Sequence, residues 1–141
     1  MSFDPVAAGA IPTTISPWLS VRGGARAVEF YKAGFGAKEV FRLEAPDGAV
    51  VARLSMDGAE FWLSDESPEN GNVSPEAVKG TPVRMVVIVT DPDAAFGRAI
   101  EAGAKEVCAM KNDHGWRVGR VVDPFGHHWE FGRKIGGQAE K

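Results

Sequence analysis

The sequence predicts an α+β fold in which two copies of one β-α-β-β-β unit follow each other along the chain. The pentapeptide Gly-Ala-Lys-Glu-Val occurs at Gly36–Val40 and again at Gly103–Val107, nearly half of the 141-residue chain apart. Each copy follows an apolar strand-like run and an amphipathic stretch, and each precedes further strand-like runs. Such self-similarity indicates an internal repeat. We therefore expect tandem βαβββ modules that form an open, cupped mixed sheet with the helices outside.

The first module is expected over residues 15–64. Alternating apolar residues predict a strand over Ile15–Val21. An amphipathic helix follows over about residues 25–34 and ends at Gly36, because helices commonly stop at a glycine with positive φ. Two glycine-containing turn signals then separate three strands, which we expect near residues 39–44, 50–56 and 59–64.

The second module, expected over residues 83–135, repeats this order. After an apolar strand, Asp91 is a natural N-cap and Pro92 fits the first helical position, where its missing N–H costs nothing. Gly103 ends this helix as Gly36 ends the first. A polar loop at 111–115 and a later turn separate three strands, which we expect near residues 106–110, 117–122 and 127–131.

Three segments lie outside the two modules. Residues 1–14 are expected to be a flexible N-terminal arm, and residues 136–141 a frayed tail. Residues 65–82, which are rich in Ser, Pro, Asn, Gly and Glu, are expected to form a connecting loop that covers a cleft.

Composition excludes several classes of function. The net charge is −3 and the basic residues are scattered singly among acids, so we expect neither a nucleic-acid nor a membrane partner. No apolar run approaches the roughly 18 residues that span a bilayer. Residues 1–5 lack the basic and apolar regions of a signal peptide, and Cys108 is the only cysteine. We therefore expect a cytoplasmic protein without an intrachain disulfide.

One face of each predicted sheet mixes aromatic and charged side chains. A helix covers only one face of its sheet, so the opposite faces must meet each other or enclose something. Strand alternation assigns nine residues to these faces: Ser16, Trp18, Ser20, Glu60, Trp62, Arg84, Val86, His128 and Glu130. A face made only for packing would rarely hold Arg, His and two Glu, whereas a ligand cavity would.

Several short motifs follow one another along the chain: Phe30-Tyr31, Gly36-Ala37, Val89-Thr90-Asp91, Gly103-Ala104, and Asp123-Pro124-Phe125-Gly126-His127 before Glu130. In this order they resemble the vicinal-oxygen-chelate (VOC) superfamily of glyoxalase I, bleomycin-resistance proteins, extradiol dioxygenases and fosfomycin-resistance enzymes. Two further motifs are similar to its PhnB-like glyoxalase/bleomycin-resistance branch: Ser16-Pro17-Trp18-Leu19 and Trp116-Arg117-x-Gly119-Arg120. The match covers about residues 15–131, and it implies paired modules in an open barrel, usually in a homodimer.

The resemblance also implies four metal-ligand positions, one on the first and one on the last strand of each module. Aligned on the repeat, these positions are Ser16, Trp62, Arg84 and Glu130. Only Glu130 can ligate in the usual way, because Arg84 carries a fixed charge and no lone pair. We therefore favour no metal cofactor and expect Arg84 to replace the ion and hydrogen-bond to Glu130. The alternative is a divalent metal at a shifted site formed by Glu60, His128 and Glu130.

The sequence therefore predicts a metal-independent binder that grips a small aromatic or amphipathic molecule between tryptophans. Its predicted ligand-binding residues are Trp18, Trp62, Arg84, Trp116 and Arg120. The alternative is a metal-dependent lyase, isomerase or dioxygenase-type enzyme, with Glu130 as the candidate general base if it is shielded from Arg84. Arg117 and Arg120 lie three apart on one strand and cannot share a face. One is expected to bind an anionic group and the other to pair with a surface acid.

Overall fold

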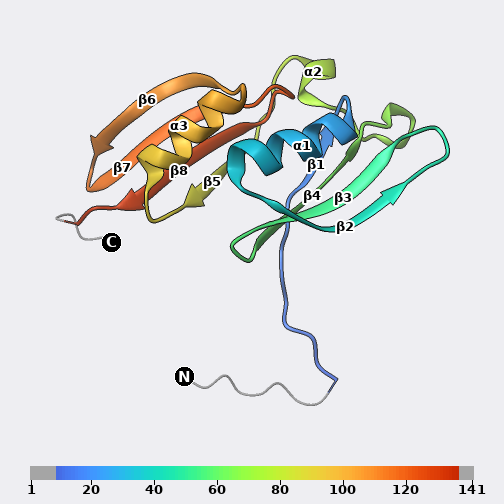
Figure 1. Cartoon of the computed structure of the whole chain (residues 1–141), viewed down its shortest axis with the longest axis horizontal. Helices are drawn as coiled ribbons and strands as arrows, with labels where there is room; N and C mark the ends of the chain where they lie inside the picture. Colours follow the sequence, from blue (N-terminus) through green and yellow to red (C-terminus); the bar gives the residue numbers. More distant parts are fainter. Residues whose placement is uncertain (1–8, 137–141) are drawn as a thin grey trace.

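The computed structural model describes residues 9–136 and consists of two β-α-β-β-β modules (Figure 1). The first module contains β1 (Trp18–Val21), α1 (Gly24–Phe35), β2 (Lys38–Glu44), β3 (Val50–Met56) and β4 (Ala59–Asp65). The second contains β5 (Arg84–Ile88), α3 (Pro92–Ala102), β6 (Lys105–Asp113), β7 (Trp116–Val122) and β8 (His128–Lys134). A short 3-10 turn, η1 (Pro68–Asn70), and a short helix, α2 (Pro75–Val78), lie between the modules. The predicted arm at 1–14 and the tail at 136–141 fall mostly outside the described residues.

The two sheets have the same topology, which confirms the predicted tandem βαβββ modules with mixed sheets. The first sheet has the strand order β1-β4-β3-β2 and the second β5-β8-β7-β6. In each module the first strand pairs in parallel with the last, and the other pairs are antiparallel. β1 and β5 are therefore edge strands with one unpaired side. No helix among residues 9–136 is long and apolar enough to cross a membrane.

The repeated pentapeptide marks the junction from helix to strand in each module. Gly36 and Gly103 follow α1 and α3 with φ angles of 68° and 127°, which a residue with a Cβ rarely adopts. The backbone N–H of Gly36 bonds to the Tyr31 carbonyl. The predicted helix ends are thus confirmed, and the pentapeptide has an architectural role.

One difference from the sequence-based expectation concerns the segment 111–115. We expected a polar loop there, but β6 continues to Asp113 and only His114 and Gly115 turn the chain. Both residues have positive φ, 51° and 86°, as a tight two-residue hairpin requires. In addition, β1 begins at Trp18, later than the expected Ile15.

The two modules share one aromatic core on the helix-covered sides of their sheets. Its largest fully buried side chains include Tyr31 of α1 and Trp129 of β8. Asp123 is buried between the modules, where it accepts hydrogen bonds from the Tyr31 hydroxyl and, at 2.9 Å, from the Trp129 indole N–H. His127 donates its backbone N–H to Asp123 and places Nε2 3.0 Å from the Ser20 carbonyl of the other module.

Candidate functional site

A row of stacked side chains crosses the open face of the first sheet, opposite α1. Trp18 and Trp62 are paired in register on β1 and β4, and their rings stack with centroids 4.9 Å apart and 5° between planes. On the β3 side, the Arg53 guanidinium lies 5.4 Å from the Trp62 ring centroid. Trp62 is thus covered from both neighbouring strands. Trp18, which is 55% exposed on the edge strand, keeps a free ring face.

The distance between the Trp18 and Trp62 rings decides whether a ligand can bind between them. A ring sandwiched between two others needs about 7 Å between them, twice a van der Waals contact. Trp18 and Trp62 are too close for that, so they do not grip a ligand between them as expected from the sequence. The Trp18 indole N–H donates to Ser64 Oγ at 2.9 Å, which fixes the orientation of its ring.

The open face of the second sheet holds the ion pair expected from the sequence. Arg84 on β5 donates from Nε to Glu130 Oε1 on β8 at 2.9 Å. The predicted contact between these two side chains is therefore confirmed. The Arg84 side chain is half exposed and Glu130 is less so, and hence the pair lies within reach of solvent and ligands.

Arg117 and Arg120 lie on opposite faces of β7. Arg117 reaches α3 on the covered face and makes two hydrogen bonds to the Asp93 carboxylate, at 2.9 and 2.7 Å. This hydrogen bonding lowers the pKa of Asp93 below its usual value. Arg120 is paired in register with Glu130 and shares the open face. The choice that the sequence left open is thus resolved, because Arg117 pairs with the acid.

A hollow of about 340 Å³ lies on the open face of the second sheet. It is lined by Val86, Ile88, Asp113, His114, Trp116, Val118, Glu130 and Gly132. Trp116 and Glu130, two of the predicted site residues, are brought together here, whereas Trp18 and Trp62 belong to the other sheet. His128 lies on the same face, in register with Arg84. Burial lowers the pKa of His128, which favours its neutral form.

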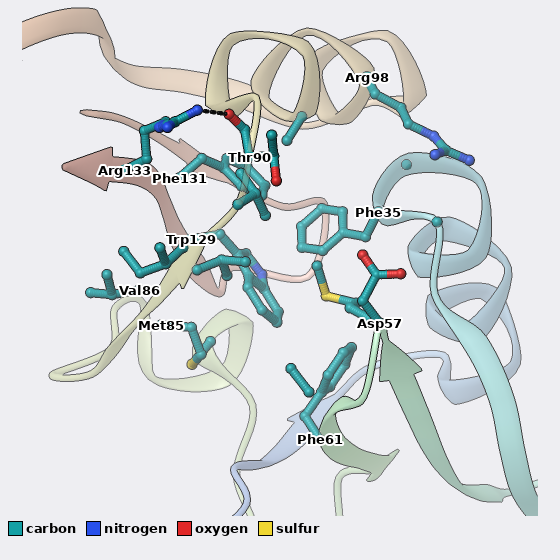
Figure 2. Close-up of a pocket in the computed structure, with 18 of the residues that line it drawn as sticks. Phe35, Asp57, Phe61, Met85, Val86, Thr90, Arg98, Trp129, Phe131 and Arg133 are labelled. Atoms are coloured by element: carbon teal, nitrogen blue, oxygen red, sulfur yellow. Dashed lines mark hydrogen bonds between the residues drawn. The ribbon is translucent and has the colours of Figure 1, made fainter. Parts of the chain in front are cut away.

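A larger cavity of about 1040 Å³ opens between the two modules (Figure 2). Its apolar walls include Phe35, Phe61, Met85, Val87, Trp129 and Phe131. Glu60 is the only one of the predicted ligand-binding, catalytic and metal-ligating residues that lines this cavity. Sequence reasoning missed this cavity because its aromatic walls are helix-facing side chains that strand alternation assigns to the core.

Two of the charged groups at this cavity are already engaged. Arg133 donates to the Thr90 carbonyl at 2.7 Å, as Figure 2 shows, and Arg98 donates to the Ala33 carbonyl at 2.9 Å. Val86 and Ile88, each 58% exposed, line both this cavity and the smaller hollow. The two cavities therefore meet around the free edge of β5.

A family model described as the glyoxalase-like domain matches residues 18–131 of the chain. The chain belongs to the glyoxalase-like domain family. An uncharacterized protein of Mycobacterium tuberculosis strain H37Rv is 39% identical to this glyoxalase-like protein over 130 residues. That match covers 89% of this chain and 76% of the relative. The finer resemblance to the PhnB-like branch stays a proposal.

Two solved structures are similar to the glyoxalase-like chain over most of its length. TioX from Micromonospora sp. ML1 has a TM-score of 0.68 and 27% identity, over 92% of this chain and 100% of that one. The fosfomycin-resistance protein FosX of Listeria monocytogenes, in complex with Mn(II) and sulfate, has a TM-score of 0.65 and 15% identity. This match covers 88% of this chain and 93% of FosX. At that identity the likeness to FosX concerns the fold alone.

The residues of this chain do not fit the metal that the family resemblance implies. Among the four aligned positions only Glu130 offers a ligating carboxylate, and the Arg84 cation already hydrogen-bonds to it. In the shifted alternative, Glu60 belongs to the first sheet, while His128 and Glu130 belong to the second. Within residues 9–136, no group of three or more His, Cys, Asp or Glu side chains is arranged to hold a metal ion.

Proposed function

We propose that this glyoxalase-like protein binds a small aromatic or amphipathic molecule without a metal ion, and that a ring of the ligand stacks on Trp18. The free ring face of Trp18 carries this proposal. Its other face is packed on Trp62, and its N–H is held by Ser64, so the exposed ring is already oriented. A rigid, exposed tryptophan offers large apolar area at little cost in conformational entropy.

The Arg84–Glu130 pair supports metal independence. The guanidinium occupies one oxygen of the carboxylate that would otherwise be the strongest ligand, and its charge would repel a cation. The same contact disfavours the alternative enzyme, because a general base must be free to take a proton from its substrate.

We also propose that the protein forms a homodimer in which a second copy covers the cavity between the modules. The walls of this cavity are apolar and come from both modules, as is typical of an interaction surface. Asp57 and Glu60 line it together with Arg98 and Arg133. A surface with charges of both signs can be complementary to itself across a two-fold axis.

The proposed ligand site can be tested by titrating 2-naphthamide into the protein and its Trp18→Leu variant. Loss of one stacking contact should weaken binding by about tenfold, which corresponds to ~1.4 kcal/mol. Phe41→Leu is the matched control, because Phe41 lies on the same face and makes an edge-to-face contact with Trp62, away from the free face of Trp18. This variant should bind as the unmodified protein does.

Indole N–H signals in NMR spectra can follow the titration, since the chain contains only four tryptophans. Equal affinity of the Trp18→Leu variant and the unmodified protein would overturn the stacking proposal. Binding that requires an added divalent metal, and disappears with a chelator, would overturn metal independence.

A further inference from the structure

We infer that the open face of the second sheet is a binding site for an amphipathic organic acid, with its carboxylate on Arg120 and its apolar part in the adjoining hollow. This site is distinct from the stacking surface at Trp18, because it lies on the other sheet and needs no aromatic ring in the ligand. The two proposals can therefore fail separately.

Arg120 is a cation without a partner among the described residues. Its Nε is buried and makes no hydrogen bond. Arg117, three residues earlier on β7, has its charge fully engaged by Asp93. A buried N–H donor without an acceptor destabilises the folded protein, and a carboxylate on the guanidinium would form charge-assisted hydrogen bonds.

A second unpartnered nitrogen lies close to Arg120. Nδ1 of His128 is buried without a hydrogen bond, and the positive charge of Arg120 acts on this imidazole. A neutral imidazole can carry its proton on Nδ1 and donate it to an anion. These two side chains lie on the same face of the sheet, on the adjacent strands β7 and β8.

The charge of this face favours an anion near Arg120. Arg84 and Glu130 neutralise each other at 2.9 Å, which leaves the charge of Arg120 uncompensated. The carboxylate of Asp113, at the far end of the hollow, contacts the His114 ring at 2.6 Å. An acid would therefore orient its carboxylate toward Arg120 and away from Asp113.

The apolar part of such a ligand has a place directly beside Arg120. Val118 lies two residues from Arg120 on the same face of β7 and lines the 340 Å³ hollow. Val86 and Ile88 of β5 and the Trp116 ring complete its apolar wall. A cavity that is mostly apolar, with a few convergent polar groups at one end, is the usual form of a small-molecule site.

The test compares octanoate with octanamide, which has the same chain length and no charge. Titration calorimetry with the full-length protein should show that octanoate binds about tenfold more tightly than octanamide, because only the acid forms charge-assisted hydrogen bonds. Arg120→Met should remove this preference and leave the affinity for octanamide unchanged. Arg117→Met is the matched control and should keep the preference, since Arg117 lies on the opposite face of the same strand.

A second variant keeps the test decisive if Arg120→Met fails to fold. Val118→Glu changes a residue that lines the hollow and not the larger cavity, and it should weaken octanoate more than octanamide, because it adds a negative charge. Equal affinities of the two probes, or an unchanged preference in Arg120→Met, would overturn the inference. Octanoate binding that is lost in Trp18→Leu and kept in Arg120→Met would also overturn it and would place the acid on the first sheet.

Discussion

Tyr31 and Asp123 form a buried hydrogen-bonded link between the two modules. The Tyr31 hydroxyl of α1 donates to Asp123, which also accepts from the Trp129 indole and from the backbone N–H groups of Phe125 and His127. Burial raises the pKa of Tyr31 well above its usual value near 10, and the nearby Asp123 charge raises it further. Tyr31 therefore stays neutral in the folded protein at pH values where it ionises in the unfolded chain.

This shift predicts a loss of stability in alkaline solution. Above pH ~10 the unfolded chain releases the Tyr31 proton while the folded protein retains it, so the free energy of unfolding falls as the pH rises. Below that pH the contribution is fully present. Urea unfolding between about pH 8 and 11 should show this fall, and Tyr31→Phe should show a shallower one. At neutral pH this variant should lose about 1 kcal/mol with the hydrogen bond.

Tyr31 is the only tyrosine of the chain, so the difference between the two pH profiles isolates its ionisation from that of the lysines. Parallel profiles for the unmodified protein and Tyr31→Phe would show that burial does not hold this hydroxyl neutral.

Strand parity and the internal repeat predicted some features of the site at the scale of residues. They placed Arg84 and Glu130 on one face, and the hydrogen bond between them is present. They could not show that Trp18 and Trp62 stack on each other, because that contact depends on the parallel pairing of β1 with β4, which are distant in sequence. Nor could the three-residue spacing of Arg117 and Arg120 decide which of them lies on the open face of the sheet. That choice depends on Asp93 of α3.

The two helices begin in different ways, although the modules are repeats. Asp91 caps α3 locally, and its side chain accepts from the Ala94 N–H at 3.1 Å. Gly23 precedes α1 and provides no side-chain cap. Its place is taken by Asp65 at the end of β4, which accepts from Gly24 N–H at 2.8 Å. The local cap of α3 was predictable from the sequence, whereas the cap of α1 comes from 41 residues away and was not.

The remote cap should matter more to stability than the local one. Asp91→Ala should lower the free energy of unfolding by about 1 kcal/mol, as is typical of an N-cap. Asp65→Ala should cost about 2 kcal/mol, because the second oxygen of Asp65 also accepts from Val50 N–H, at 2.7 Å, and both donors are partly buried. Urea unfolding at neutral pH measures both changes. Asp47→Ala, which removes one exposed turn contact, is the control and should change stability least.

A larger loss in Asp91→Ala than in Asp65→Ala would contradict this account of how α1 begins. Equal losses in all three variants would mean that the bonds to Gly24 and Val50 contribute no more than an exposed turn does.

At the scale of the whole molecule, the modules are held together by their helices and separate toward the free edge of β5. Figure 1 shows α1 and α3 next to each other where the two modules meet. The helices approach so closely that a Cβ on Gly34 would lie 2.8 Å from the Cβ of Ala102. This contact closes the core on one side and leaves the 1040 Å³ cavity beside β5. The repeat predicted the two modules, but their relative placement depends on such nonlocal contacts.

The homodimer proposed to cover this cavity predicts a specific effect of charge at its wall. Ile88 is 58% exposed on the edge strand and lines the cavity, so Ile88→Asp should place an unpaired charge in the dimer interface without disturbing the core. Light scattering after gel filtration should give twice the chain mass of 15.1 kDa for the unmodified protein and the single-chain mass for the variant.

Ile135→Asp is the matched control, because Ile135 is 49% exposed and does not line the cavity. It should leave the dimer intact, which excludes a general effect of a surface aspartate. Two results would contradict the proposal. One is that the unmodified protein elutes as a monomer at all concentrations, and the other is that the Ile88→Asp variant still elutes as a dimer. In either case the apolar walls beside β5 would need a different occupant, because an exposed apolar surface of this kind is rarely left open to water.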